Sequence, residues 1–187
     1  MMPVAFHIFD TAHGFAAIGW RADRVVSFRL PAPNRDEAEH ALLRRHPDAA
    51  PAEPPAAIRG VMTDAVRYFA GERIDFAAAP IDLGMQPTFF AMVYAQVRAL
   101  GYGETTAYGA VAKALGRGPE MARVVGQAMA GNPIPLIVPC HRVTAAGGQV
   151  GGFSAPGGSS AKLRMLEMEG VTLAPSAKES AQAAFNF

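Results

Sequence analysis

The sequence predicts an α/β N-terminal part followed by a mainly α-helical C-terminal part that contains a helix-turn-helix. Short apolar runs separated by turn residues begin the chain, whereas from Thr88 onward the apolar residues follow the 3.6-residue period of packed helices. Two later helical segments are joined by the glycine-rich turn Gly116-Arg117-Gly118. The chain has 187 residues, half of them hydrophobic, which is enough for one large domain or two small ones. We expect an N-terminal domain with a linker over 1–84, a C-terminal domain over 85–175 and a tail over 176–187.

Three predicted strands begin the N-terminal domain. Phe6–Phe9, Ala16–Trp20 and Val25–Leu30 are apolar or alternating, and turn residues separate them, which indicates an antiparallel meander. Asn34 is placed to cap a helix that runs to about His46.

A second helix is predicted near Ala56–Ala70, where Gly71 is suited to end it. One side of this helix is expected to be apolar and to consist of Ile58, Met62, Ala65, Val66 and Phe69. The irregular stretch Phe76–Met85 then serves as the linker between the two parts.

The C-terminal domain is predicted to begin with a packed helix. Its stripe is formed by Phe89, Met92, Val93, Gln96, Val97 and Leu100. Thr105 or Thr106 is expected to cap a short helix, and Pro119 suits the first position of the next helix, Pro119–Ala130. A bare pair of such helices is also typical of an ordinary helical hairpin, so the pattern alone leaves both interpretations open.

The outer face of the predicted helix Pro119–Ala130 favours DNA binding. One face of this helix is formed by residues at i, i+3, i+4 and i+7, which are Arg123, Gly126, Gln127 and Ala130. The side chains on this face are small except for those of Arg123 and Gln127. Small residues allow close approach to a narrow groove, and an arginine beside an extruded base could fill the vacated stack. Minor-groove binding gives little sequence readout, which suits a protein that inspects any sequence of double-stranded DNA.

Cys140 is the only cysteine and follows the stiff apolar run Pro133–Val138. A cysteine in this position is often an inert core residue. Its neighbourhood suggests reactivity instead, because His141 is adjacent and a histidine acting through a water molecule could remove the thiol proton. Glu169 is the best candidate to orient that histidine, and Glu167 is the less favoured one.

The stretch 147–158 is too rich in glycine for a helix or strand, and we interpret it as a loop that closes over a base. A last helix is predicted over Lys162–Glu169, with Leu163 and Leu166 facing inward.

The composition excludes several classes of protein. A single cysteine permits no internal disulfide and no cysteine-based zinc site, and the five histidines lack metal-ligand spacing, so we expect no metal. No apolar run reaches the roughly 18 residues that span a bilayer, and the first residues lack a signal-peptide pattern. We therefore expect a soluble, cytoplasmic monomer. Residues 1–84 contain 9 Lys and Arg against 11 Asp and Glu, whereas residues 85–187 contain 8 against 5. A nucleic acid would therefore prefer the C-terminal part.

The residues around Cys140 resemble the signature of the O6-alkylguanine-DNA alkyltransferases. Pro139-Cys140-His141-Arg142-Val143 carries the resemblance, and about 85 C-terminal residues support it. The further matches are Gly103-Glu104-Thr105, Ala107-Tyr108, Arg123-Val124-Val125-Gly126, Gly131-Asn132-Pro133, Gly157-Gly158, Lys162 and Glu169. The N-terminal part is similar only in outline, through Tyr68-Phe69-Ala70-Gly71 and Ile81-Asp82-Leu83. The resemblance implies a ribonuclease-H-like N-terminal domain.

The resemblance also implies a single-use reaction without a cofactor, in which Cys140 attacks the alkyl carbon of O6-alkylguanine, and possibly of O4-alkylthymine. His141 would act through water, Glu169 would hold His141, and Asn132 would brace the turn. Tyr108 would assist the leaving guanine. The remaining implied DNA contacts are Arg123 in the base stack together with Gln127, Ala130 and Thr105.

The implied substrate contacts are the carbonyls of Cys140 and Val143, the Ser154 N–H, Phe153 and Met129. Phe153 departs from the family pattern, in which a tyrosine is usual, and the loop 154–158 is longer than in some relatives.

Two other classes of protein compete with the transferase. A DNA-damage sensor with the same helices would lack the cysteine, and a cysteine hydrolase would need an oxyanion arrangement that the sequence does not suggest.

Overall fold

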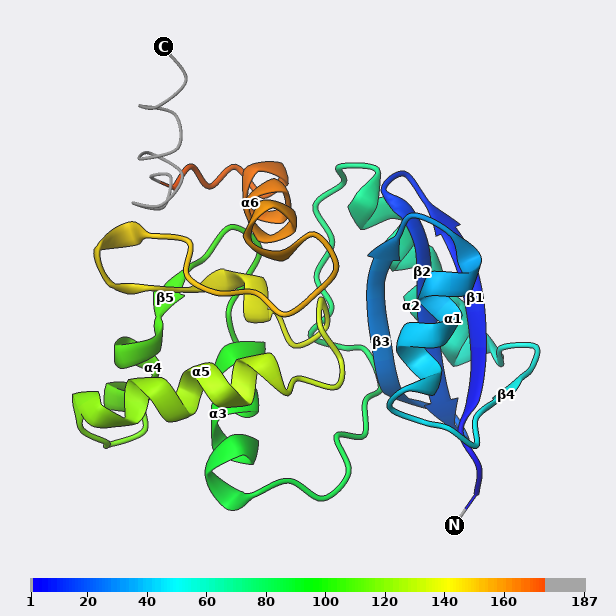
Figure 1. Cartoon of the computed structure of the whole chain (residues 1–187), viewed down its shortest axis with the longest axis horizontal. Coiled ribbons are helices and arrows are strands. Elements are labelled where there is room, and N and C mark those ends of the chain that lie inside the picture. The colour runs from blue at the N-terminus through cyan, green and yellow to red at the C-terminus, as the bar shows by residue number, and fades with distance from the viewer. Residues whose placement is uncertain (1, 174–187) are drawn as a thin grey trace.

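The computed structural model describes residues 2–173, in which an α/β part precedes a mainly helical part (Figure 1). The predicted tail over 176–187 lies outside the described residues. Three strands form the expected antiparallel meander: β1 (Ala5–Thr11), β2 (Gly14–Arg21) and β3 (Arg24–Ala32). A two-residue strand, β4 (Ala50–Pro51), pairs in parallel with β1, so the sheet order is β3-β2-β1-β4. Gly14 opens β2 with φ +117°, where a Cβ would collide with the carbonyl oxygen of Ala32.

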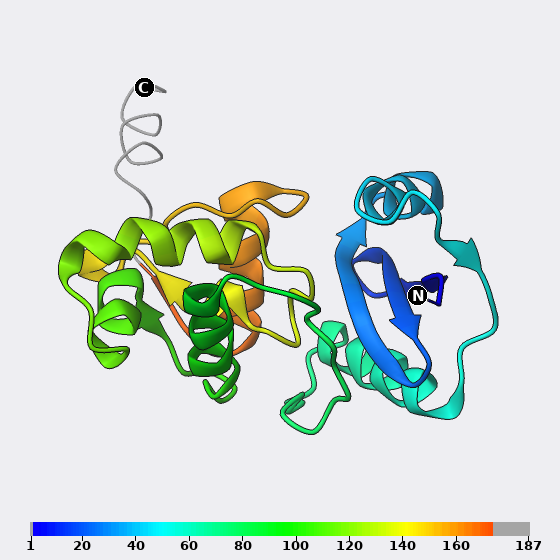
Figure 2. The same cartoon turned by 90° about the horizontal axis from the view of Figure 1, so that it is seen from below.

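Helices cover both faces of this sheet. Helix α1 (Arg35–Leu43) begins at Asn34, whose side chain accepts a hydrogen bond from the Glu37 backbone N–H, as predicted. It ends three residues before the predicted His46. Helix α2 (Ala56–Phe69) packs on the other face, and Figure 2 shows the sheet between the two helices.

The predicted apolar side of α2 is wrong at one position. Val66 is 39% exposed, whereas Met62 is partly buried and packs against the core cluster. The buried side also includes Val61 and Tyr68, which were not predicted, so a tyrosine faces the core.

The C-terminal part contains α3 (Thr88–Arg98), α4 (Tyr108–Ala114), α5 (Ala122–Ala130) and α6 (Gly158–Met168). The predicted helix from Pro119 divides into a 3-10 turn, η1 (Pro119–Met121), and α5. Two short 3-10 turns, η2 (Cys140–Arg142) and η3 (Ala146–Gly148), lie in the loops that follow. Leu166 is buried in α6 as predicted, but Leu163 is only partly buried.

The expected threonine cap of α4 is wrong. Ala107 occupies the cap position, and no side chain caps the helix. Thr106 instead belongs to β5 (Thr106–Ala107), which pairs in parallel with β6 (Val143–Thr144) just after the cysteine. Backbone pairing has replaced side-chain capping at this position.

The apolar run before Cys140 joins the two parts of the molecule. Ile134, Leu136 and Ile137 are almost fully buried in the same cluster as the sheet and α2. The Phe28 N–H in β3 donates to the Pro133 carbonyl at 3.0 Å. Full burial of one such side chain contributes about 1.5–3 kcal/mol, so this segment anchors the cysteine turn to the sheet.

Candidate active site

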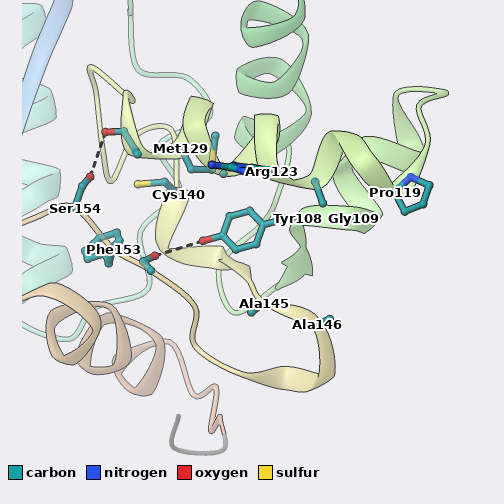
Figure 3. A pocket seen from close by; sticks show the side chains of 14 residues that line it. Tyr108, Gly109, Pro119, Arg123, Met129, Cys140, Ala145, Ala146, Phe153 and Ser154 are labelled. Atoms are coloured by element: carbon teal, nitrogen blue, oxygen red, sulfur yellow. Dashed lines mark hydrogen bonds between the residues drawn. The ribbon is translucent and has the colours of Figure 1, made fainter. Parts of the chain in front are cut away.

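Cys140 opens the turn η2 and lies in the wall of a pocket of about 830 Å³ (Figure 3). The thiol residue is only 6% exposed. The pocket lies between α4, α5 and the glycine-rich loop, and most of its lining is apolar. Its lining residues are Tyr108, Gly109, Pro119, Ala122, Arg123, Gly126, Met129, Ala130, Cys140, Ala145, Ala146, Gly152, Phe153 and Ser154.

Asn132 braces the turn that carries Cys140. Its side-chain Nδ2 donates to the Val138 carbonyl at 2.8 Å, and its Oδ1 accepts from the Ile134 N–H at 3.0 Å. Within this turn Leu136 has φ +76°, a left-handed conformation that costs a non-glycine residue about 1–2 kcal/mol. The buried amide and the buried Leu136 side chain hold this strained backbone in place.

Glu169, immediately after α6, is the centre of a buried polar network. Its Oε1 lies 2.7 Å from His141 Nε2 and also accepts from the Tyr68 hydroxyl at 2.7 Å and Arg142 Nη2 at 3.0 Å. Its Oε2 accepts from Arg142 Nε at 2.9 Å and from the Gly103 N–H at 3.0 Å. The carboxylate therefore has five donors, and the structure pairs His141 with Glu169 rather than with the exposed Glu167.

The charges in this network define the tautomer of His141. Burial alone would raise the pKa of Glu169, but hydrogen bonds from His141 and Arg142 and the positive charge of Arg142 hold it well below its usual range. Burial also lowers the pKa of His141, so its ring is neutral at pH 7. Because the ionised carboxylate accepts from Nε2, the proton is on Nε2 and Nδ1 carries the free lone pair. Nδ1 is buried and has no hydrogen-bond partner among the described groups, which leaves it available as a base.

Burial raises the pKa of the Cys140 thiol, while a hydrogen bond from Asn132 and the charge of Lys162 act in the opposite direction. The thiol is therefore mainly protonated at neutral pH and needs a base to react. Asn132 and Lys162, which lower the pKa of the thiol against the effect of burial, are both held in place by hydrogen bonds to backbone groups.

Lys162 is fully buried in α6, and burial lowers its pKa to about 8. Its Nζ donates to the carbonyls of Val143 at 2.6 Å and Gly152 at 3.3 Å, and to the Tyr108 hydroxyl at 3.3 Å. One cation thus ties the cysteine turn, the glycine-rich loop and α4 together.

The expected substrate contacts are only partly gathered in the pocket. Met129, Phe153 and Ser154 line it, and Figure 3 shows the Ser154 hydroxyl bonded to the Ala130 carbonyl, at 3.2 Å. Val143 is fully buried and is not a lining residue, and its carbonyl already accepts the Lys162 bond. A carbonyl has two lone pairs, so the expected contact with guanine stays a prediction.

The expected DNA contacts divide between two places. Arg123, Gln127 and Ala130 are exposed on one face of α5, and Arg123 and Ala130 also line the pocket. Thr105 is exposed but lies outside the pocket lining, just before β5. Tyr108 lines the pocket, and its hydroxyl donates to the Gly152 carbonyl at 3.3 Å.

Three residues of the site received no role from the sequence: Tyr68, Arg142 and Lys162. All three lie within the segments that resemble the family, and a charged residue at a helix position that faces the core is the signal that identifies Lys162. Tyr68 lies 101 residues from its partner Glu169, and no local pattern indicates that contact.

Within residues 2–173, no group of three or more histidine, cysteine or carboxylate side chains could hold a metal ion. None of the helices in that range combines the length and the apolar character needed to cross a bilayer.

The comparison with known proteins agrees with this site. The family described as "6-O-methylguanine DNA methyltransferase, DNA binding domain" matches residues 88–171. A DNA base-flipping protein of Thermus thermophilus is 42% identical over 134 residues, which cover 71% of this chain and 84% of that protein. The chain belongs to the 6-O-methylguanine DNA methyltransferase family. A methylated-DNA–protein-cysteine methyltransferase of Mycobacterium leprae is 46% identical over 103 residues, which cover 54% of this chain and 59% of that protein.

Solved structures of the family extend the likeness to both parts of the chain. The O6-methylguanine methyltransferase of Mycobacterium tuberculosis has a TM-score of 0.71 and 29% identity, covering 95% of this chain and 99% of that one. The structure of Mycobacterium tuberculosis OGT in complex with DNA has the same TM-score at 31% identity, covering 89% and 92%. The arrangement of an α/β N-terminal part and a helical C-terminal part is therefore that of the methyltransferase family.

Proposed function

We propose that this protein repairs DNA by transferring the alkyl group of O6-alkylguanine to Cys140 in a single, stoichiometric reaction. The observation that carries the proposal is the position of the thiol. Cys140 lies in the wall of an apolar pocket, next to a histidine whose Nε2 is held 2.7 Å from a buried carboxylate. We extend the proposal to O4-alkylthymine, which presents the same type of alkyl–oxygen bond.

His141 acts as the base through a bridging water molecule. The thiol proton moves through that water to Nδ1, and Sγ attacks the alkyl carbon from the side opposite the oxygen. The sulfur–carbon bond forms as the carbon–oxygen bond breaks, and the guanine leaves with the electron pair. Tyr108 donates a hydrogen bond to the leaving base, and the proton that His141 took from the thiol passes back through water to that base, which leaves His141 neutral again. The product thioether is a poor leaving group, so each molecule reacts once.

The helices α4 and α5 form the helix-turn-helix that binds double-stranded DNA in the minor groove. The exposed face of α5 presents Arg123, Gln127 and Ala130 to the duplex. Thr105, which precedes α4, contacts the DNA backbone. Extruding the damaged base costs a few kcal/mol, and Arg123 offsets part of this cost by filling the stack. The extruded base enters the pocket beside Met129 and Phe153, where the Ser154 N–H and the carbonyls of Cys140 and Val143 read its edge.

Further parts of the proposal concern the organisation of the whole protein. Residues 1–84 form a ribonuclease-H-like domain with its linker, and residues 85–175 form the DNA-binding and transfer domain. The protein acts as a cytoplasmic monomer without a cofactor.

A second candidate function is DNA binding with base flipping but without alkyl transfer. The observation that favours it is the 42% identity with the DNA base-flipping protein of Thermus thermophilus. The network around Glu169 favours the transferase, because a binding protein has no need for a base next to a buried thiol.

Titration of a methylated duplex distinguishes the two functions. Increasing amounts of protein are incubated with a duplex that carries O6-methylguanine, and the methylated base remaining in the DNA is measured. Stoichiometric repair that stops when the protein is consumed supports the transferase. Tight binding with the methylated base retained supports base flipping alone.

A further inference from the structure

A cluster of positive charges lies on the N-terminal part, at the end of α1 and on the neighbouring strands. We call it the basic cluster and define it by Arg21, Arg29, Arg44, Arg45 and His46. Burial and the neighbouring charges of Arg45 and Arg44 lower the pKa of Arg29 to about 10. Burial together with Arg45, Arg29 and Arg21 lowers the pKa of His46. The charges that act on these two residues are all positive.

Few cations among the described residues have a carboxylate partner, and the members of the basic cluster have none. Arg35, Arg67 and Arg142 each form an ion pair with an aspartate or glutamate. No member of the cluster forms such a pair within the part of the chain that the structure describes. The Nε atoms of Arg21 and Arg29 are also buried there without a hydrogen-bond partner. Within the described residues, the arginines of the basic cluster therefore have neutral hydrogen-bond acceptors, such as Ser27 Oγ for Arg29 and the Gly131 carbonyl for Arg45, but no negative charge to offset their repulsion.

The basic cluster borders the pocket that contains Cys140. Arg45 Nη2 donates to the Gly131 carbonyl at 3.1 Å, immediately after the C-terminal end of α5. Arg29 and Arg44 line a smaller cavity of about 100 Å³ that Cys140 and Ser154 also line. Figures 1 and 2 both place α1 and α5 on the same side of the molecule, with the end of α5 directed toward the end of α1.

We infer that Arg44 and Arg45, the exposed arginines of the basic cluster, bind the phosphate backbone of the same duplex that α5 contacts, so that the N-terminal part extends the DNA-binding surface. This inference rests on the proposed function. Helix α5 is only about 13 Å long at 1.5 Å per residue, whereas duplex DNA carries one charge per 1.7 Å of its axis. A duplex that runs along the axis of α5 from Arg123 therefore continues past the other end of the helix. Guanidinium groups bind phosphate oxygens in a bidentate manner, so the arginines of the basic cluster are chemically suited to phosphate.

This surface was not predictable from the charge balance. Residues 1–84 carry an excess of acidic side chains, which directed the expected DNA contacts to the C-terminal part. Folding collects several of their arginines at one place, and Asp36 and Glu37 in the first turn of α1 form no ion pair with them, although both line a surface pocket with Arg44.

Salt-dependent DNA binding tests the inference. The affinity of the full-length protein for a duplex with and without O6-methylguanine is measured by fluorescence anisotropy at several salt concentrations. Arg44 is exposed, and its side chain makes no hydrogen bond to any group that the structure describes, so Arg44→Ala removes mainly charge. Loss of one phosphate contact lowers the slope of log affinity against log salt by about 0.9. We expect this change with a loss of affinity of about 2–5-fold at low salt, a larger loss in Arg44→Glu, and restoration in Arg44→Lys.

Arg67→Ala is the matched control, because it removes the same charge from α2 on the opposite face of the sheet. Equal slopes for the wild type, Arg44→Ala and Arg44→Glu would overturn the inference, as would an equal loss of affinity in Arg67→Ala. A wild type that takes up a methyl group while the Arg44 variants bind normally overturns this inference alone. A wild type that takes up no methyl group, but whose DNA binding depends on Arg44, overturns the proposed function alone.

Discussion

The hydroxyl of Tyr68 donates a 2.7 Å hydrogen bond to Oε1 of Glu169, the same oxygen that lies 2.7 Å from His141 Nε2. Tyr68 belongs to α2 in the N-terminal part, and Glu169 follows α6 in the C-terminal part. Burial raises the pKa of Tyr68, so its hydroxyl keeps its proton and acts as the donor. The N-terminal part therefore supplies one of the groups that hold the carboxylate partner of His141.

Replacing Tyr68 with phenylalanine removes this donor and preserves the ring. A hydrogen bond to a charged group contributes about 1.5–3 kcal/mol, so we expect the free energy of unfolding of Tyr68→Phe to fall by that amount. We also expect slower alkyl transfer at saturating DNA, because His141 loses part of its alignment, with unchanged DNA affinity. Urea unfolding and single-turnover kinetics over a range of pH measure both effects.

Tyr102→Phe is the control for this variant, because the Tyr102 hydroxyl donates to the Met168 carbonyl beside the network but not to Glu169. An unaltered transfer rate and pH profile in Tyr68→Phe would contradict the positioning role of Tyr68.

Glu169 links stability to pH. Its pKa in the folded protein is held below its ordinary value of 4.5, so the folded state favours the ionised form. The resulting stabilisation is present above about pH 4.5 and is lost as the pH falls toward the lower folded-state pKa. Glu169→Gln also leaves the buried Arg142 without its counter-charge, which costs about 3–5 kcal/mol at pH 7. We expect the stability difference between wild type and variant to shrink as urea unfolding is repeated from pH 5 to pH 3. A difference that stays constant over this range would show that the charge of Glu169 is not responsible.

Lys162 lowers the pKa of the Cys140 thiol through its positive charge. Lys162→Met keeps a side chain of similar length but removes that charge, so we expect the thiol pKa to rise further. The pH dependence of iodoacetamide labelling of Cys140 measures it. Labelling of Lys162→Met should be slower than labelling of the wild type. The difference should be largest below about pH 8, where Lys162 is protonated in the wild type. Lys113→Met, at an exposed position of α4, serves as the control, and equal labelling profiles for all three proteins would refute the effect.

Arg123 increases the rate of alkyl transfer only when the alkylated base must leave a duplex. We expect Arg123→Ala to slow transfer from O6-methylguanine in duplex DNA by about 10- to 100-fold, equivalent to about 1.4–2.7 kcal/mol. Transfer from the free O6-alkylguanine base should be unaffected. Single-turnover rates with both substrates provide the test, and Arg164→Ala on the exposed surface of α6 controls for loss of charge. Equal slowing with both substrates would place Arg123 in the chemistry rather than in base extrusion.

Local signals in the sequence predicted most of the fold. The alternation of apolar residues located three strands, and the Asn34 side chain begins α1 as predicted. The errors arose where tertiary contacts override local preference. Val66 has the chemistry of a core residue, but the sheet selects Tyr68 and Val61 instead. Thr106 has the chemistry of a cap, but its backbone pairs with Val143.

The site was predictable to the extent that its chemistry is local in the chain. Cys140 and His141 are adjacent, and Asn132 contacts the same turn six residues before Val138. Glu169 was also predicted, although it lies 28 residues from His141, because the base needs a carboxylate partner and the last helix offered only Glu169 and Glu167. The contacts of Tyr68 and of the basic cluster need the folded chain, because they join residues that are 101 and 86 positions apart.

The intact mass of the protein after incubation with a duplex containing O6-methylguanine tests the central claim most directly. Alkyl transfer replaces the thiol proton with a methyl group, so the wild type should gain the mass of one CH₂ unit, and peptide mapping should place it on Cys140. Cys140→Ser should keep its original mass while still binding the duplex. A wild type that binds the methylated duplex with unchanged mass, or that carries the methyl group on another residue, would contradict the account.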